Sequence, residues 1–331
     1  MQTFYFAQAE DANQAATMLA DADGRGAKPI AGGTTLLDLM KLNVMHPGRL
    51  VDINKALSSR IEVFDGGVRL GAMVRMAEAA AHETIVRDYP VVAQSLLLAA
   101  SSQIRNMASL GGNVLQRTRC GYFRDPTVVN CNKRKSGSGC AAFDGINRMH
   151  AVLGTSRTCI ATYHGDFAQA LILLDAKVDI LGHRGKRTIA FGELHVRPDR
   201  DPAIETTLQS DDLITAFVIP AASWARRSLY LKIRDRDSYA YALASAAVAL
   251  DLDGDRIRRA RIALGGVATV PWRAIEAEKY LEGKILNDDS AAEAGRVAFS
   301  TSETRSHNAF KPKLGERTVA RALMLAKGLE I

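Results

Sequence analysis

The sequence predicts an α+β protein in which short strands are separated by helices. Short apolar runs of strand length, such as Val68–Leu70, end at turn residues, whereas apolar residues over Ala15–Leu19 fall at helical spacing. The pattern changes near Pro220–Arg227, which indicates that a second domain begins there. We therefore expect at least two domains, each built from short strands and helices.

Each element before the cysteine-containing part of the chain follows from its local pattern. A glycine turn is expected at Gly111 and Gly112. The other expected elements are a helix over Ala12–Ala22, a strand over Lys28–Ala31, a helix or tight turn over Thr34–Lys41, strands over Val51–Ile53 and Val68–Leu70, and helices over Met76–Ala81 and Val91–Ala100.

The segment from Cys120 to Cys159 has few periodic apolar positions and is expected to form a long ordered loop. A loop of this length inside a compact domain is usually functional. Regular patterns resume after it. They predict a helix over Ala168–Leu174, strands over Val178–Leu181 and Ile214–Ile219, a strand from Leu229, an alanine-rich helix over Tyr241–Leu250 and a strand over Ile257–Leu264.

The composition excludes several classes of function. Hydrophobic residues make up 47% of the 331 residues and charged residues 24%, as in ordinary globular proteins. The net charge is +7, but the densest basic patch, Lys133–Lys135, is too small for a nucleic-acid surface. The N-terminal residues lack the basic and apolar regions of a signal peptide, and no run of about 18 apolar residues predicts a membrane span. We therefore expect no binding of nucleic acid and no membrane span.

The four cysteines of the chain, Cys120, Cys131, Cys140 and Cys159, all lie within 40 residues. Such clustering indicates a joint task, and three tasks compete. Disulfides suit an oxidising compartment, structural zinc usually has closely spaced cysteine pairs, and an iron–sulfur cluster tolerates varied spacing. The gaps of ten, eight and eighteen residues, with nearby glycines and the basic residues Arg119 and Lys133–Lys135, favour a cluster over zinc and zinc over disulfides.

Two glycine pairs stand beside polar residues at predicted turns. Gly32 and Gly33 lie at a strand-to-helix junction before Thr34, and Gly111 and Gly112 lie between Ser109 and Asn113. Backbone N–H groups of such turns can converge on an anion. Either pair alone fits an ordinary turn, but two of them suit a dinucleotide whose pyrophosphate is held from two sides.

Several segments resemble one known family in the same order along the chain. The segments AGGTTLLDLMK, IRNMASLGGNV, GDFAQALILLDAKVDIL, LITAFVIP and LKIRDRDSYAYALASAAVAL resemble the FAD subunit of the xanthine dehydrogenase and aldehyde oxidoreductase family, the molybdenum hydroxylases. The cysteine segment, with TRCGYFRDP and NCNKRKSGSGCAAFDG, resembles one branch of it. That branch is the FAD subunit of bacterial, often periplasmic, three-subunit aldehyde oxidoreductases, which holds a 4Fe–4S cluster in this loop.

The resemblance implies a set of FAD-binding residues. The first turn would wrap the pyrophosphate, and Ser109, Gly112 and Asn113 would close on the phosphate and ribityl side. Asp166, Ile214 and Lys232 match a hydrogen-bonding aspartate, an apolar contact and a lysine near the flavin ring. From the residues alone, Asp166 also fits a helix cap, which could hold together with FAD binding, Ile214 fits a strand core better, and Lys232 fits a solvated lysine equally well. The first turn comprises Pro29, Ile30, Ala31, Gly32, Gly33, Thr34, Thr35 and Leu36.

The resemblance also implies the cluster and the fold. All four cysteines would ligate a 4Fe–4S cluster. The fold would be a two-subdomain FAD-binding fold of the vanillyl-alcohol-oxidase (PCMH) type, followed by a C-terminal α/β domain with a three-stranded sheet. The expected ranges are 1–222 for the FAD-binding domain, with subdomains of about 1–55 and 56–222 and the iron–sulfur loop at 117–160, and 223–331 for the C-terminal domain.

The function implied is electron transfer inside a heterotrimer. A large molybdenum subunit would oxidise an aldehyde, and a small 2Fe–2S subunit would pass electrons to FAD here and on to an external acceptor. We find no nicotinamide site and no catalytic residue; the seven histidines form no ligand-like pair. The alternatives are a stand-alone flavin oxidoreductase and a metal-stabilised binding module without flavin. We expect export to the periplasm with a partner subunit, or otherwise a cytoplasmic location.

Overall fold

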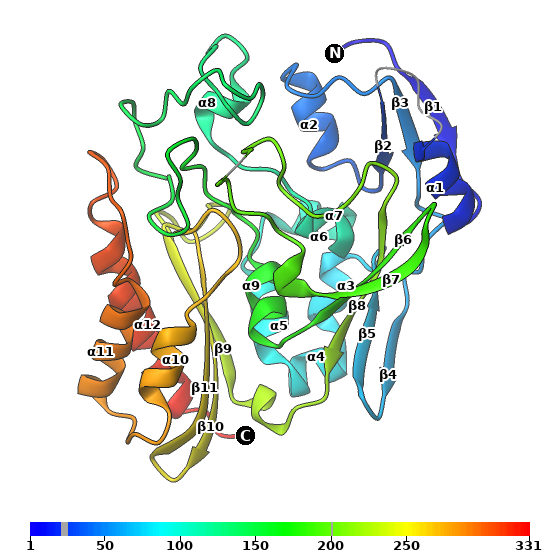
Figure 1. Ribbon diagram of the computed structural model, residues 1–331. Helices are drawn as coiled ribbons and strands as arrows, with labels where there is room; N and C mark the ends of the chain where they lie inside the picture. The colour runs from blue at the N-terminus through cyan, green and yellow to red at the C-terminus, as the bar shows by residue number, and fades with distance from the viewer. Residues whose placement is uncertain (21–25, 200) are drawn as a thin grey trace.

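The computed structural model describes residues 1–20, 26–199 and 201–331, and it contains three sheets with helices packed around them (Figure 1). The first sheet is parallel, with strand order β1-β3-β2, so that the ends of β2 and β3 lie at one edge. Its strands are β1 (Tyr5–Gln8), β2 (Ala27–Ile30) and β3 (Arg49–Asp52), accompanied by helices α1 (Ala12–Ala20) and α2 (Leu36–Lys41).

The second sheet has five strands in the order β4-β5-β8-β6-β7, and its neighbours pair antiparallel. Its strands are β4 (Ile61–Phe64), β5 (Gly67–Gly71), β6 (Lys177–Gly182), β7 (Gly185–Ala190) and β8 (Leu213–Pro220). The helices that accompany it are α3 (Met76–Ala81), α4 (Glu83–Asp88), α5 (Pro90–Leu97), α6 (Ser102–Met107), α7 (Leu110–Val114) and α9 (Phe167–Leu173), with 3₁₀ turns at Phe191–Glu193 and Ser223–Arg226.

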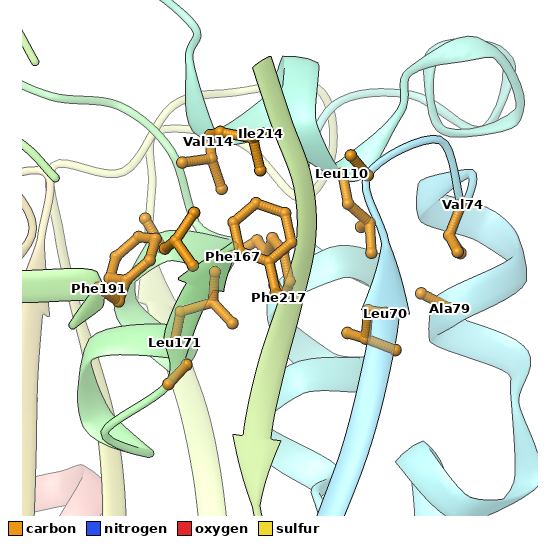
Figure 2. Packing of buried hydrophobic residues seen from close by; sticks show 14 of the residues in the cluster. Leu70, Val74, Ala79, Leu110, Val114, Phe167, Leu171, Phe191, Ile214 and Phe217 are labelled. Carbon is orange, nitrogen blue, oxygen red and sulfur yellow. The ribbon is translucent and has the colours of Figure 1, made fainter. Parts of the chain in front are cut away.

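A phenylalanine cluster forms the core between the second sheet and helix α9 (Figure 2). Phe167 of α9 meets Phe217 of β8 edge-on, with ring centroids 5.8 Å apart, and Phe191 lies 6.4 Å from Phe217. All three side chains are buried. Edge-to-face pairs of this kind stabilise a core beyond the area that they bury.

The cysteine segment has little regular structure, as the sequence predicts. Between α7 and α9 the chain forms one short helix, α8 (Gly121–Arg124), and an isolated bridge pairs Cys131 with Cys140. The rest is a loop held by turns and side-chain hydrogen bonds, and in Figure 1 it lies on the side of the molecule where α2 lies.

The C-terminal sheet contains the three long strands that the fold class predicts, with a two-residue strand at one edge. Its order is β12-β11-β10-β9, and helices α10, α11 and α12 lie beside it (Figure 1). The elements are β9 (Ser228–Ile233), β10 (Ala244–Asp253), β11 (Arg256–Gly265), β12 (Trp272–Arg273), α10 (Ile275–Leu281), α11 (Asp288–Ala298) and α12 (Lys311–Lys327).

The alanine-rich helix predicted over Tyr241–Leu250 is wrong, because Ala244–Asp253 form strand β10. Residues Ala244 to Leu250 are buried on both faces of the sheet. Val248 packs in the core that contains α12, whereas its neighbour Ala249 packs in the core that contains α9. Small side chains let helices approach both faces of this strand, so that tertiary packing overrides the helical preference of alanine.

The other predicted elements are confirmed within a few residues, with one further correction. The predicted turn at Gly111 and Gly112 is instead the start of helix α7. The helix predicted over Ala12–Ala22 runs from Ala12 to Ala20, and its last two predicted positions lie outside the described residues. In the described ranges, no helix is both long and apolar enough to cross a membrane.

We predict that Phe217→Ala lowers the free energy of unfolding by about 3–5 kcal/mol, because it leaves a cavity beside two other phenylalanines. Chemical denaturation followed by circular dichroism measures this change. The control is Phe64→Ala on edge strand β4, where the side chain is 48% exposed and the expected loss is below about 1 kcal/mol. Equal losses for the two variants would contradict this account of the core.

Candidate functional site

A cavity of about 590 Å³ opens where the first sheet, helix α7 and the segment before β8 meet. Its wall is built from parts of the chain far apart in sequence, which the fold brings together. Eleven of the residues predicted to bind FAD line it: Pro29, Ile30, Ala31, Gly32, Gly33, Thr34, Thr35, Leu36, Ser109, Gly112 and Ile214.

The first glycine turn connects strand β2 to helix α2 at the cavity wall. Gly33 has a positive φ of 70°, a conformation that other residues adopt only with strain. A Cβ on Gly32 would lie 2.1 Å from the carbonyl oxygen of Met107, so only glycine allows this contact between the two parts of the wall. Helix α2 begins at Leu36, and the first amides of a helix have no carbonyl partner within it. This turn can therefore present backbone donors to an anion.

The second glycine pair does not present free amides, contrary to the expectation from sequence. The N–H groups of Leu110 and Gly111 donate to the carbonyls of Val74 and Ala72, each at 2.9 Å. The N–H group of Gly112 donates to Oγ of Ser109, which caps helix α7. Ser109 and Gly112 thus contribute to the cavity wall through their surfaces, while their capping contacts hold the helix in place.

Asn113 follows the glycine pair but does not line the cavity. Its side-chain nitrogen lies 3.3 Å from the sulfur of Met76. Its side-chain oxygen is buried and has no hydrogen-bond partner among the described residues. A buried polar atom without a partner is costly, so this oxygen is suited to a donor that a bound ligand supplies.

Asp166 and Lys232 form a buried ion pair rather than part of the cavity wall. Nζ of Lys232 donates to Asp166 at 2.8 Å, and the hydroxyl of Tyr230 donates to the same carboxylate at 2.6 Å. Burial raises the pKa of Asp166, and the charge of Lys232 opposes that rise. Asp166 occupies the N-cap position of helix α9, as its alternative role predicts, but its side chain makes no capping hydrogen bond. Lys232 is buried, so its alternative role as a solvated lysine is wrong.

Ile214 combines both of its expected roles. It is 4% exposed in the core of strand β8, and it also lines the cavity. Strand core and ligand contact are therefore compatible at this position.

The structure adds cavity residues that the sequence analysis missed. Lys28 and Arg117 bring positive charge to the wall, and burial, with a contribution from Arg117, lowers the pKa of Lys28. The rings of Tyr163 and His195 also line the cavity and pack together with centroids 4.8 Å apart. Lys28 directly precedes the predicted turn, but nothing in the sequence placed the others beside it. Basic groups and rings suit an anionic, aromatic ligand such as a dinucleotide.

The four cysteines meet around a second, small cavity. All four are free thiols, so the disulfide alternative is not what the structure shows. Across the described ranges, no three His, Cys, Asp or Glu side chains converge closely enough to hold a single metal ion. Burial raises the pKa of Cys120 to about 12 and also raises the pKa of Cys140 and Cys159.

Backbone amides point at these sulfurs. The N–H of Ala161 donates to Sγ of Cys159 at 3.4 Å, and hydrogen bonds from backbone groups lower the pKa of Cys120 and Cys140 against the effect of burial. A donor set of four thiols with amides aimed at them fits a thiolate-ligated iron–sulfur cluster. The space between the sulfurs is about 10 Å³, room for one water-sized body, so a cluster requires these side chains to rotate apart.

The two cavities share part of one wall. Lys133, Cys159 and Ala161 line both of them. Glu205 stabilises this wall, because its carboxylate accepts hydrogen bonds from Arg117 and, at 2.9 Å, from Nζ of Lys133. Burial raises the pKa of Cys159, and the positive charge of Lys133 partly offsets that rise.

The other basic residues of the cysteine segment mostly hold the loop. Arg134 donates to backbone carbonyls, including that of Phe123 at 2.7 Å. Arg119 pairs with Asp38 of helix α2 at 3.0 Å. Lys133 and Arg134 of the basic patch seen in the sequence are therefore used in contacts within the protein.

Comparison with known proteins gives consistent matches over nearly the whole chain. Residues 2–222 match the family model described as the FAD binding domain in molybdopterin dehydrogenase, and residues 228–326 match the CO dehydrogenase flavoprotein C-terminal domain. The aldehyde oxidoreductase FAD-binding subunit PaoB of Escherichia coli is 44% identical over 304 residues, covering 91% of this chain and 92% of PaoB.

More distant relatives share the fold. The carbon monoxide dehydrogenase medium chain of Afipia carboxidovorans is 26% identical over 92% of this chain and 90% of its own length. A solved structure of reconstituted CO dehydrogenase from Oligotropha carboxidovorans superposes with a TM-score of 0.76 at 23% identity, covering 98% of both chains. Quinoline 2-oxidoreductase from Pseudomonas putida 86 gives a TM-score of 0.75, also at 23% identity and covering 98% of this chain and 97% of its own.

We predict that Lys232→Met lowers the free energy of unfolding by about 3–5 kcal/mol, because it leaves the carboxylate of Asp166 buried without its cation. The double variant Asp166→Asn with Lys232→Met should recover most of that loss. Chemical denaturation of the two variants and the wild type measures this coupling. Additive losses in the double variant would show that the pair is not coupled.

Proposed function

Because this chain belongs to the family of FAD-binding medium subunits of molybdenum hydroxylases, we propose that it binds FAD in the 590 Å³ cavity and carries electrons within a multi-subunit aldehyde oxidoreductase. The observation that carries the proposal is the cavity itself. It gathers the glycine turn after β2, the capped start of α7 and the basic side chains of Lys28 and Arg117 around one space.

The residues of this chain have distinct roles toward FAD. The amides after β2, together with Lys28 and Arg117, bind the pyrophosphate. Ile214 and the ring of Tyr163 supply apolar contacts. Asn113, Asp166 and Lys232 lie outside the cavity lining, so their contacts with FAD stay predictions. FAD supplies the redox chemistry, and the protein binds and orients it.

The second part of the proposal is that Cys120, Cys131, Cys140 and Cys159 ligate a 4Fe–4S cluster. Three observations support it: the shared cavity, the backbone donors to sulfur and the absence of a disulfide between these thiols. Cys159, Ala161 and Lys133 line both cavities, so a cluster held by these cysteines would lie next to the FAD cavity.

The proposed complex contains a large molybdenum subunit and a small 2Fe–2S subunit, with an aldehyde as substrate and an external electron acceptor. The relatives support this assembly, because they include an aldehyde oxidoreductase subunit and a carbon monoxide dehydrogenase medium chain. Export of the complex to the periplasm with a partner subunit is part of the proposal. A stand-alone flavin oxidoreductase is the competing function, but Glu205 in the cavity lining is held in ion pairs with Arg117 and Lys133.

Anaerobic addition of an aldehyde tests the electron-transfer role. In the purified complex the aldehyde should bleach the flavin absorbance, whereas this chain alone with FAD should not respond. Bleaching of the isolated chain would instead establish the stand-alone oxidoreductase. No bleaching in a complex that contains molybdenum, 2Fe–2S centres and FAD would contradict the proposed electron path.

We predict that Gly33→Val weakens FAD binding roughly tenfold, because a side chain at φ 70° costs about 1–2 kcal/mol and its Cβ would lie 2.8 Å from Leu37. Flavin per protein, measured after dialysis, reports the loss. Gly192→Ala is the control, since its Cβ meets only an ordinary contact at 3.9 Å. Full flavin content in Gly33→Val would argue against this turn as a binding element.

We predict that Cys131→Ser loses the cluster and keeps FAD, because serine replaces a soft thiolate with a hydroxyl that binds iron poorly. Iron and flavin are measured on the same purified sample. Val129→Ala is the control in the same loop, where the side chain is 76% exposed. Full iron content in Cys131→Ser would refute ligation by this cysteine.

A further inference from the structure

His150 lies against the cavity that the four cysteines line. Its Nε2 is 3.2 Å from Sγ of Cys120, and the side chain is buried, with its ring 6.1 Å from the ring of Tyr122. Among the histidines that the structure describes, His150 is the one that contacts a cysteine sulfur. This contact is not predictable from the sequence, because thirty residues separate the two side chains.

The chemistry of ligation determines the direction of this hydrogen bond. A cysteine that binds iron is a thiolate, which can only accept. Nε2 of His150 must then carry its proton whether the imidazole is neutral or charged. Nδ1 is buried and makes no hydrogen bond of full geometry in the described part of the chain, although the backbone of Asn147 lies close enough to raise the pKa of His150.

A buried lysine acts electrostatically on the imidazole. Lys311, at the start of α12, is fully buried, and its Nζ donates to the carbonyl of Gly266 at 2.7 Å. Burial lowers the pKa values of His150 and His164, and the charge of Lys311 lowers them further. Burial also lowers the pKa of Lys311 to about 7, so a negative charge nearby would favour its charged form. None of the carboxylates in the described residues pairs with Lys311. A buried cation usually has a partner, and the negative charge of a thiolate-ligated cluster would supply one nearby.

We propose that His150 donates Nε2–H to the ligating sulfur of Cys120, and that Lys311 adds positive charge behind it, so that the two residues raise the reduction potential of the cluster. This inference rests on the proposed cluster. Reduction adds one negative charge to the cluster, and both a hydrogen bond to sulfur and a nearby cation favour the more negative form. His150 and Lys311 are therefore positioning and tuning residues, and neither is a ligand.

The test is the midpoint potential of the cluster, measured by a redox titration of its electron paramagnetic resonance signal in the purified complex. His150→Leu and Lys311→Met should each shift the potential to more negative values at full iron content. His150→Gln, which retains a side-chain N–H, should recover part of the shift. The matched control is His164→Leu, a buried histidine near Lys311 without a contact to a cysteine, which should leave the potential nearly unchanged.

A second measurement needs no variant that could fail to fold. Wild-type complex carrying ¹⁵N-labelled histidine should show a hyperfine coupling between the reduced cluster and an imidazole nitrogen, together with an exchangeable proton. Absence of that coupling, or an unchanged potential in His150→Leu with full iron, would overturn the proposal. An unchanged potential in Lys311→Met alone would remove the lysine from it.

These outcomes are distinguishable from failure of the proposed function. A wild-type complex with FAD but without iron in this chain would refute the cluster and therefore this inference. A wild-type complex with a full cluster and no imidazole coupling would refute only the hydrogen bond from His150.

Discussion

The ion pairs that hold the cysteine segment against other parts of the chain are the constraint on which the rest of the structure depends. Residues 115–166, with one short helix, separate α7 from α9, and they cannot satisfy their own polar groups through a sheet. They are held instead by contacts to three different parts of the chain. These are the pairs Arg119–Asp38 with α2, Lys133–Glu205 with the segment before β8, and Arg148–Asp235 with the loop after β9.

This arrangement explains why the two candidate sites adjoin. The ion pairs hold the segment at the end of the first sheet, where the segment closes one side of the large cavity. The four thiols lie together around the small cavity within the segment. The ion pairs differ in how much they stabilise the position of the segment. Lys133–Glu205 is largely buried, so loss of one partner is costly, whereas Arg148–Asp235 is exposed and contributes little. The buried charges therefore determine where the segment lies.

Local sequence patterns predicted the elements whose structure is decided locally. Helix α3 begins and ends where the spacing predicts, and the glycine turn after β2 has the positive φ that Gly33 suggests. The failures have tertiary causes. The alanines of strand β10 predict a helix, but in the structure they pack against a neighbour on each face of the sheet. The ion pair of Asp166 with Lys232 joins residues 66 positions apart, and the contact of His150 with Cys120 also depends on the folded loop.

The central claim is that this segment is a cofactor site beside a flavin site, and one measurement tests it most directly. Iron and acid-labile sulfide are determined per FAD in this chain, purified anaerobically from its complex. About four iron and four sulfide per FAD are expected for a 4Fe–4S cluster beside one flavin. FAD without iron or sulfide would contradict the claim and leave the buried ion pairs alone to hold the loop.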